Sequence, residues 1–193
     1  MTYVPYRTAT GNSWISVDSH LLSDGRMFII GEINSELACE FVQELMYLQK
    51  EKPESDLKIY IYSPGGEVTA GLMIYDALKG LDIDFEIYCM GMAASMAAII
   101  LAGGQKGRRY IMPHSKVMIH EPLIAGGVGG SATSIQRTAE SILETKRISV
   151  ELLAKDTGKS IEEVEKAISF DNYMNAQEAI DFGICDSIVT KII

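Results

Sequence analysis

The sequence predicts one α/β domain, and three observations support this class. The chain has 193 residues, of which 47% are hydrophobic and 22% charged, enough to bury one full core. Segments with strand patterns alternate with segments with helix patterns, which is typical of α/β proteins. No long linker, repeat or low-complexity tract interrupts this order. We therefore expect a single domain over residues 1–193, with residues 1–18, which lack strong periodicity, as a mobile start.

The first half of the chain contains two expected helices and two expected strands. Residues 36–51 predict a helix that ends before Pro53, with four apolar side chains on one face: Leu37, Phe41, Leu45 and Leu48. Residues 57–62, LKIYIY, alternate as in a strand, and SPGG then forms a turn. A helix over residues 67–80, closed by a glycine, leads to a second strand at residues 83–89.

The second half predicts further helices and short strands. A helix begins within the small and apolar residues 91–102, GMAASMAAIILA. After a glycine-rich segment, a long helix runs to Lys155 with Gly158 beyond it, and Ser160 opens a capping box, SIEE. Short strands are expected at residues 108–112 and 116–120. A last short helix is expected at residues 175–183, and a closing strand at residues 184–193.

Charge and composition exclude several classes of protein. The net charge of −9 argues against a large surface for nucleic acid or anionic membrane. The start has no signal-peptide pattern, and the longest apolar run, residues 89–102, is shorter than the roughly 20 residues needed to span a bilayer. We expect a cytoplasmic protein without a cofactor.

The three cysteines give no sign of a metal site or a disulfide. Cys39, Cys89 and Cys185 lie far apart, without a CxxC motif or a neighbouring histidine cluster. Buried, reduced thiols are the expected state of such residues in the cytosol.

Ser95 is the candidate nucleophile. It follows an expected strand and opens an expected helix, where unpaired backbone N–H groups can stabilise an oxyanion beside the hydroxyl. Its small neighbours would let a substrate backbone approach closely. The alternative is an ordinary serine N-cap, and this segment alone does not decide between the two.

A serine needs an adjacent base, and only three histidines are available. His20 lies in the expected unstructured start, and His114 follows a proline in a turn that we expect to face solvent. His120 ends a strand at a loop, where functional side chains gather in α/β folds. It is the preferred base on position, although a strand-end histidine often has only a structural role.

The third member of a triad would be an acid that orients the histidine. Asp171 lies in an expected loop between two helices, but an ordinary turn or cap aspartate fits the same pattern. Among 26 acidic residues, the sequence pattern alone does not single it out. Glu121, directly after His120, would point away from it along the strand.

The motif SPGGEV offers a second source of oxyanion donors. Two glycines directly after a strand permit positive φ and a close backbone approach, although a tight βα turn explains them equally well. SPGG, MAAS and MIH each follow an expected strand. We therefore expect the three segments to meet at one end of the sheet.

Three ordered motifs resemble the ClpP family, the proteolytic subunit of the Clp protease. They are YIYSPGGEVTAGLMIYDAL, GMAASMAAIILAGGQKGRRYIMPHSKVMIHEP and ELLAKDTG followed by DNYMNAQEAIDFGICDSI, and the likeness covers about residues 27–190. The resemblance implies a crotonase-like spiral of ββα units with a projecting handle at about residues 121–158. It also implies a serine peptidase with Ser95 as nucleophile, His120 as base and Asp171 as its orienter. Gly66 and Met96 would supply the oxyanion-hole N–H groups.

The same resemblance implies partners and a substrate path. Family members stack two seven-subunit rings around a chamber, and an ATPase unfoldase feeds them unfolded polypeptide. Substrate would pair as an added strand with the backbone near Val68 and near Leu123, Ile124 and Ala125. Tyr60 would belong to a docking pocket for the unfoldase.

The chain also departs from the family pattern. Glu121 replaces a glutamine, Phe170 replaces an arginine used in subunit contacts, and PLIAGGVGG is two residues longer than its family counterpart. GNSWISVDSHLL replaces the usual axial-entrance sequence. These departures favour a divergent paralogue, and they motivate one alternative to an active peptidase: a structural or activating subunit of a mixed ClpP complex. The other alternative is a crotonase-like acyl-CoA enzyme, because SPGG and the helix start could form an oxyanion hole for that chemistry as well, although such a reaction needs no serine nucleophile.

Overall fold

The computed structural model describes residues 2–8, 11–52, 56–124 and 127–192, and it confirms the α/β class. Within these residues the main sheet has seven strands, and five of them lie side by side in parallel, in the spatial order β3-β4-β5-β6-β9. They are β3 (Arg26–Ile30), β4 (Leu57–Ser63), β5 (Phe85–Ala94), β6 (Arg109–Ile111) and β9 (Ser187–Ile188). The strand β7 (Lys116–Ile119) pairs in parallel with the end of β5 and antiparallel with β8 (Asn172–Met174).

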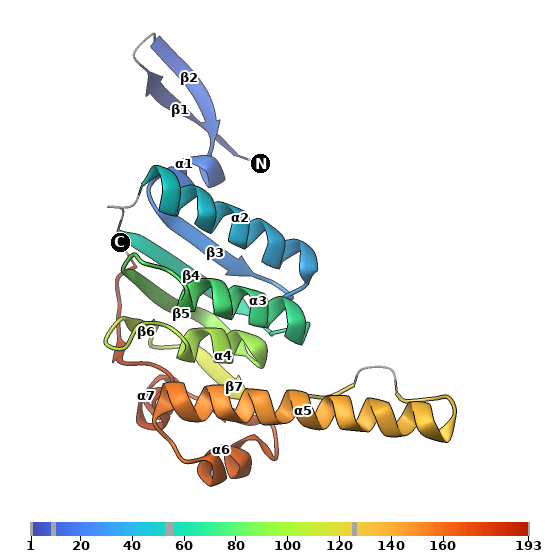
Figure 1. Ribbon diagram of the computed structural model, residues 1–193. Helices are drawn as coiled ribbons and strands as arrows, with labels where there is room; N and C mark the ends of the chain where they lie inside the picture. The colour runs from blue at the N-terminus through green and yellow to red at the C-terminus, as the bar shows by residue number, and fades with distance from the viewer. Residues whose placement is uncertain (1, 9–10, 53–55, 125–126, 193) are drawn as a thin grey trace.

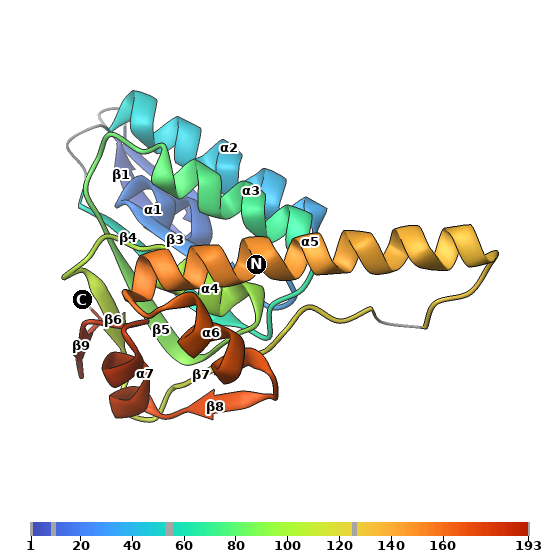
Figure 2. The same ribbon diagram turned by 60° about the horizontal axis from the view of Figure 1, so that its bottom comes forward.

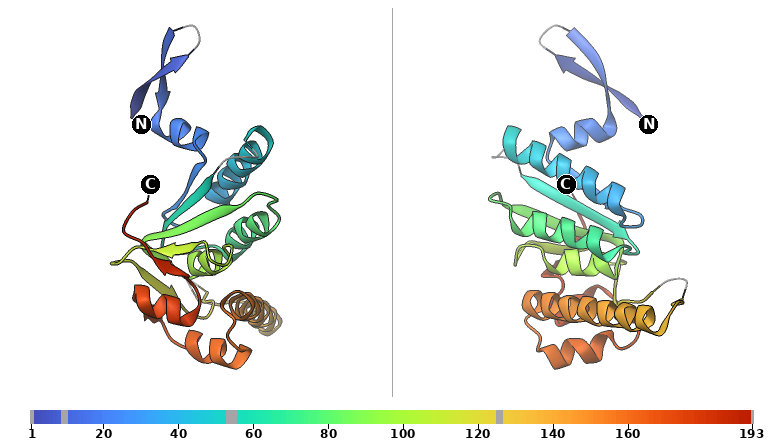
Figure 3. Two further views of the ribbon diagram at one scale, coloured as in Figure 1. Left: turned by 90° about the vertical axis from the view of Figure 1, so that its left-hand side faces the viewer. Right: turned by 45° about the vertical axis from the view of Figure 1, so that its right-hand side comes forward.

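Three helices cover one face of this sheet. The helices α2 (Ser35–Glu51), α3 (Val68–Lys79) and α4 (Met96–Ala102) lie side by side along it (Figures 1 and 3). Their apolar faces pack on β4 and β5 and form the core, which includes the fully buried Phe41, Leu48, Ile59, Ile74 and Ile100. Most residues of β4 and β5 are buried, because these two strands lie in the interior of the sheet.

An aromatic ladder crosses the other face of the sheet. Phe28, Tyr60, Tyr88 and Tyr110 occupy paired positions on β3 to β6, with ring centroids 5.3, 5.2 and 4.9 Å apart. The Tyr60 hydroxyl donates a hydrogen bond of 2.7 Å to the carbonyl of Ile192, and burial raises the pKa of this phenol. The C-terminal segment thus closes over the ladder.

The N-terminal segment differs from the expectation for it. It forms a hairpin of β1 (Tyr3–Thr8) and β2 (Gly11–Ser16), which projects from the body, followed by α1 (Val17–Ser23) (Figure 1). His20, expected in an unstructured start, therefore lies in a helix, which the Ser16 side chain caps. Cross-strand pairs stabilise such a hairpin, and single-sequence periodicity detects them poorly. The mobility of residues 1–18 stays a prediction.

The C-terminal part carries a projecting helix. The helix α5 (Ala132–Thr157) extends well beyond the sheet, and α6 (Ile161–Ile168) and α7 (Ala176–Phe182) pack near its base (Figure 2). The predicted capping box is present, with Ser160 and Glu163 bonded reciprocally. In the described part of the chain, no helix is both long and apolar enough to cross a membrane.

Several boundaries and exposures correct the sequence predictions. The closing strand is only Ser187–Ile188, because β6 offers it a short partner, whereas β5 continues through Ala94. The strands β3 and β8 were not predicted at all. All three cysteines are free, but Cys39 is exposed on α2, so only two of them are buried.

Candidate active site

Ser95 lies at a sharp turn between β5 and α4. Its φ of 54° and ψ of −125° make it the only non-glycine residue with positive φ in the described chain. Such a conformation costs on the order of 1–3 kcal/mol and persists only when the surrounding structure enforces it. Ser95 occupies the N-cap position of α4, yet its side chain makes no capping hydrogen bond. The N-cap alternative therefore does not account for the hydroxyl.

Strand pairing brings His120 to Ser95. The parallel register of β5 and β7 sets Ala94 opposite Met118, and the Ser95 N–H donates a 2.8 Å bond to the Met118 carbonyl. His120 follows two residues later at the end of β7. Its Nε2 atom lies 2.9 Å from the Ser95 Oγ atom, a normal hydrogen-bond distance. Two residues 25 positions apart thus meet at one sheet edge.

Asp171 reaches the same histidine through the antiparallel pair of β7 and β8. Ile119 lies opposite Asn172, so the next pair along the ladder is His120 and Asp171. The Asp171 Oδ1 atom is 3.4 Å from the His120 Nδ1 atom. The Asp171 side chain is 67% exposed, whereas that of His120 is 15% exposed. The carboxylate therefore faces the ring while it keeps contact with water.

This order of contacts fixes what each nitrogen can do. If Nδ1 carries the ring proton toward Asp171, then Nε2 is free to accept the proton of the Ser95 hydroxyl. The contact of 3.4 Å is longer than a typical N–H···O bond, as is common in free enzymes before substrate binds. The arrangement can thus support a serine nucleophile with a histidine base.

The SPGG turn packs directly against Ser95. Ser63 is fully buried, donates to the Gly31 carbonyl and accepts from the Gly65 N–H, which holds the turn in place. Ile33 pairs with Gly66 in a parallel β-bridge, through hydrogen bonds to the two residues that flank Gly66. The Ile33 N–H donates to the Gly65 carbonyl, and the Ile33 carbonyl accepts from the Glu67 N–H. The N–H of Gly66 itself therefore points away from Ile33.

A second amide lies beside this turn. Met96 is the first residue of α4, so its N–H has no partner within the helix. A Cβ atom built on Gly65 would lie 3.1 Å from the Met96 nitrogen and 2.6 Å from the Ser95 Cβ. The expected convergence of SPGG, MAAS and MIH is thus found at one end of the sheet.

We expect Gly65→Ala to disrupt this site. Gly65 has a φ of +91°, and an added Cβ would lie 2.6 Å from the Ala94 carbonyl oxygen as well as from Ser95. The Ser95 turn must then shift, so reactivity of Ser95 toward a fluorophosphonate should fall at least about 100-fold. Intact mass spectrometry measures the adduct, and circular dichroism reports folding. Gly107→Ala, at a positive-φ glycine with open space around it, is the control. Undiminished labelling of a folded Gly65→Ala protein would contradict the expectation.

A small cavity is lined by Ser95, and a larger groove shares Val68 and Pro122 with this cavity. The cavity, of about 20 Å³, is walled mainly by apolar side chains, which include Val68, Ile99 and Leu153. The groove, of about 640 Å³, lies between α5 and the segment after His120, and it includes Val68, Leu123 and Ile124. These three were sequence candidates for substrate contact. The fourth, Ala125, lies outside the described residues.

Other sequence candidates lie elsewhere. His114 is exposed in a turn, as expected. Glu121 does not face His120, because its carboxylate pairs with the Lys146 ammonium of α5 at 2.6 Å. Burial raises the pKa of Cys89 to about 12, which makes this thiol a poor nucleophile. Ser149 of α5, which the sequence reasoning missed, lines the cavity beside Ser95.

Polar contacts also hold the N-terminus of α3 in place. The exposed Glu67 carboxylate accepts bonds from the hydroxyls of Thr69, at 2.6 Å, and Ser35, at 3.0 Å. These bonds hold the pKa of Glu67 below its usual value. They anchor the segment directly after Gly66 to the first turn of α2.

One comparison with known proteins bears on the whole chain. A family model described as Clp protease matches residues 9–192. The match includes every strand and helix that positions Ser95, His120 and Asp171.

Proposed function

Because the chain belongs to the Clp protease family, we propose that it is a serine endopeptidase subunit that hydrolyses unfolded polypeptides inside an oligomeric chamber. One observation carries this proposal. The Ser95 hydroxyl, held on a strained turn, is hydrogen bonded to a histidine whose other nitrogen faces a carboxylate. This is the arrangement that activates a serine for acyl transfer.

Acylation uses the three side chains in sequence. Ser95 Oγ attacks the carbonyl carbon of the scissile peptide while His120 Nε2 accepts the hydroxyl proton. The carbonyl oxygen becomes negative in the tetrahedral intermediate, and the N–H groups of Gly66 and Met96 stabilise it. The C–N bond then breaks, and His120 returns the proton to the leaving amine. Asp171 stabilises the imidazolium that exists between these two transfers.

Deacylation repeats the steps with water. His120 Nε2 takes a proton from a water molecule, whose oxygen attacks the acyl-Ser95 ester. The second tetrahedral intermediate collapses, the C–Oγ bond breaks, and His120 returns the proton to Ser95. The products are a carboxylic acid and the regenerated enzyme.

The backbone around the site supports an extended substrate. Val68 is the first residue of α3, so its N–H has no intrahelical partner. Leu123 and Ile124 make no backbone hydrogen bond to another described residue. A polypeptide could add as a strand beside these groups, but only if its own backbone is unpaired. An unfolded chain presents an unpaired backbone along its whole length, which supports unfolded polypeptide as the substrate.

The assembly belongs to the same proposal. We infer paired seven-subunit rings in the cytoplasm, fed by a Clp-type ATPase that unfolds the substrates, with no metal or cofactor in the reaction. The exposed apolar side chains of the projecting α5, such as Ile135 and Leu143, favour a subunit that is covered in an assembly.

Covalent labelling tests the proposed function most directly. The purified protein, treated with a fluorophosphonate, should gain one adduct per chain, mapped by peptide mass spectrometry to Ser95. Serine reacts quickly only where a base and an oxyanion hole are already in place. The proposal would be wrong if no adduct formed, either on the purified protein alone or after a ClpP paralogue is added.

A structural or activating subunit of a mixed complex is the second candidate. The exposure of Asp171 beside the 60% exposed Phe170 favours it, because water weakens the pull of this carboxylate on His120. If labelling of Ser95 appears only when a paralogue is added, the subunit depends on its partner for alignment.

A further inference from the structure

We propose that Arg137 forms a subsite for an acidic side chain of the substrate, several residues from the scissile bond. This inference rests on the proposed peptidase function and names the class of substrate that the site prefers. Arg137 lies on α5 and lines the groove of about 640 Å³ beside the segment Pro122–Ile124.

The groove continues the cavity beside Ser95. Val68 and Pro122 line both spaces. The groove-lining residues of α5 recur at steps of three and four, which places them on one helical face: Thr133, Ser134, Arg137, Thr138, Ser141, Ile142 and Thr145. The same face continues to Ser149 and Leu153, which line the cavity. A chain bound at Ser95 can therefore extend along α5 without leaving this face.

The lining of the groove is uncharged except for one side chain. Serine and threonine hydroxyls alternate there with aliphatic groups, and Arg137 is the only charged residue of the lining in the described part of the chain. A neutral groove with one guanidinium selects for a carboxylate at the matching position.

The charge of Arg137 is available to a ligand. The Arg137 side chain has no hydrogen bond or ion pair with any other described residue, whereas acidic side chains on and beside α5 have partners of their own. Glu140 accepts from the Gln136 amide, Glu144 pairs with Arg147, and Glu121 pairs with Lys146. Lys146 and Arg147, the next two cations along α5, are thus paired with carboxylates, whereas Arg137 is not.

The net charge of the chain increases the effect of the Arg137 guanidinium on substrate preference. At −9, the protein repels acidic polypeptides over most of its surface. A lone guanidinium in the groove gives such a substrate one favourable position and fixes its register relative to Ser95.

Helix geometry sets the distance of this position from the scissile bond. Arg137 precedes Ser149 by twelve positions on α5, which corresponds to about 18 Å along the helix axis. An extended peptide advances about 3.3 Å per residue, so the acidic side chain should lie about five or six residues from the cleaved bond.

Matched fluorogenic peptides test the inference. All peptides share one core sequence around the scissile bond. Each carries glutamate, glutamine or lysine at one test position, and this position is varied from three to eight residues away from the bond on either side. We expect the wild-type kcat/KM ratio of glutamate to lysine to reach about fivefold near the fifth or sixth position, mainly through KM. Arg137→Gln should bring this ratio to one or below, because the net negative charge of the protein then acts alone, and Arg137→Glu should lower it further. Arg147→Gln, on another face of α5, should leave it unchanged.

Binding measurements separate this inference from the proposed function. Fluorescence anisotropy with labelled forms of the same peptides and Ser95→Ala protein needs no hydrolysis. If peptides are not cleaved but glutamate still binds better through Arg137, the subsite stands and the peptidase proposal fails. If peptides are cleaved and Arg137→Gln leaves the ratio unchanged, the subsite is wrong. The subsite would also be wrong if Arg137→Gln changed the mass of the assembly but not the glutamate-to-lysine ratio. A second copy of the chain, not substrate, would then cover the groove.

Discussion

Ser95→Ala is expected to lower kcat for peptide hydrolysis about a million-fold, to the limit of detection. The substitution removes the nucleophile, and the other hydroxyl that lines the cavity, that of Ser149, instead donates a hydrogen bond to the Thr145 carbonyl. His120→Ala should cause a similar loss, because the Ser95 hydroxyl then has no base within hydrogen-bond distance. The double variant should lose nothing more, since the two residues act as one unit.

Each substitution has a matched control in the same chain. His114→Ala removes an exposed histidine from a turn, and Ser169→Ala removes an exposed hydroxyl that donates a hydrogen bond to the Lys166 carbonyl. Both should retain wild-type hydrolysis of a fluorogenic peptide. Asp171→Asn should cost less than Ser95→Ala, on the order of 10⁴-fold in kcat. A folded Ser95→Ala protein that keeps more than about 1% of the wild-type rate would refute the assignment of the nucleophile.

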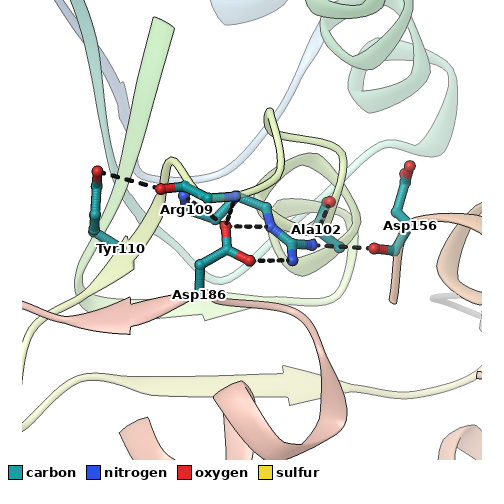
Figure 4. A network of polar contacts seen from close by, with 6 residues as sticks. Ala102, Arg109, Tyr110, Asp156 and Asp186 are labelled. Carbon is teal, nitrogen blue, oxygen red and sulfur yellow. Dashed lines mark hydrogen bonds and ion pairs between the residues drawn. The ribbon is translucent and has the colours of Figure 1, made fainter. Parts of the chain in front are cut away.

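Asp186→Asn is expected to reduce the free energy of unfolding by about 3–5 kcal/mol. Arg109 is buried on β6, and Asp186 binds it through two bonds, from Nε at 2.9 Å and from Nη2 at 2.6 Å (Figure 4). The Asp186 carboxylate also accepts the backbone N–H groups of Gly107 and Arg109. Loss of its charge would leave the guanidinium buried without a counter-ion.

The consequence spreads because Arg109 joins several elements. Its Nη1 atom donates to the carbonyls of Ala102, at the end of α4, and Asp156, near the end of α5 (Figure 4). Asp156 in turn accepts bonds from the Tyr75 hydroxyl and the Lys79 ammonium of α3. Burial and the bond to Asp156 raise the pKa of Tyr75, so the phenol stays neutral and keeps donating.

The neighbouring arginine provides the control for this prediction. Arg108 pairs with Asp84 at 2.8 Å, but both side chains are exposed. Asp84→Asn should therefore change stability by less than about 1 kcal/mol. Urea unfolding followed by circular dichroism measures both variants. Equal effects of Asp84→Asn and Asp186→Asn would contradict the role given to the buried pair.

The Arg109–Asp186 pair should also make the free energy of unfolding depend on pH in the acid range. Partial burial raises the pKa of Asp186, but its bonds to Arg109 and to backbone N–H groups outweigh this and hold the pKa below the ordinary value of 3.8. A carboxyl with a depressed folded-state pKa stabilises the protein above its unfolded pKa and loses that contribution as pH falls through the folded value. The difference between wild type and Asp186→Asn should therefore shrink below about pH 4.

Much of the fold was predictable from local pattern. The helix over residues 36–51 has apolar residues at helical spacing, and the structure contains α2 at Ser35–Glu51. The capping box at Ser160 was equally local, since its two bonds lie within four residues. The strand β3 and the hairpin of β1 and β2 were missed because their stability comes from partners distant in sequence or across a turn.

The candidate site was only partly predictable in the same way. Ser95 and His120 each follow a strand, which is a local signal of a position at a sheet edge. Asp171 has no such signal, and only the resemblance to the ClpP family selected it. Its place opposite His120 depends on the register of β7 and β8, which join residues more than 50 positions apart.

The sequence by itself determined the class of the fold, the small residues around Ser95 and the glycines that let a loop approach it. These properties follow from side-chain size, apolar spacing and permitted φ values, which are local. Only the tertiary structure decided which side chains meet, because hydrogen-bond registers between β5, β7 and β8 set the 2.9 Å and 3.4 Å contacts of His120. It also decided that Arg137, the one charged residue among the described residues of the groove lining, keeps an unpaired side chain, since ion pairing depends on neighbours that folding brings together.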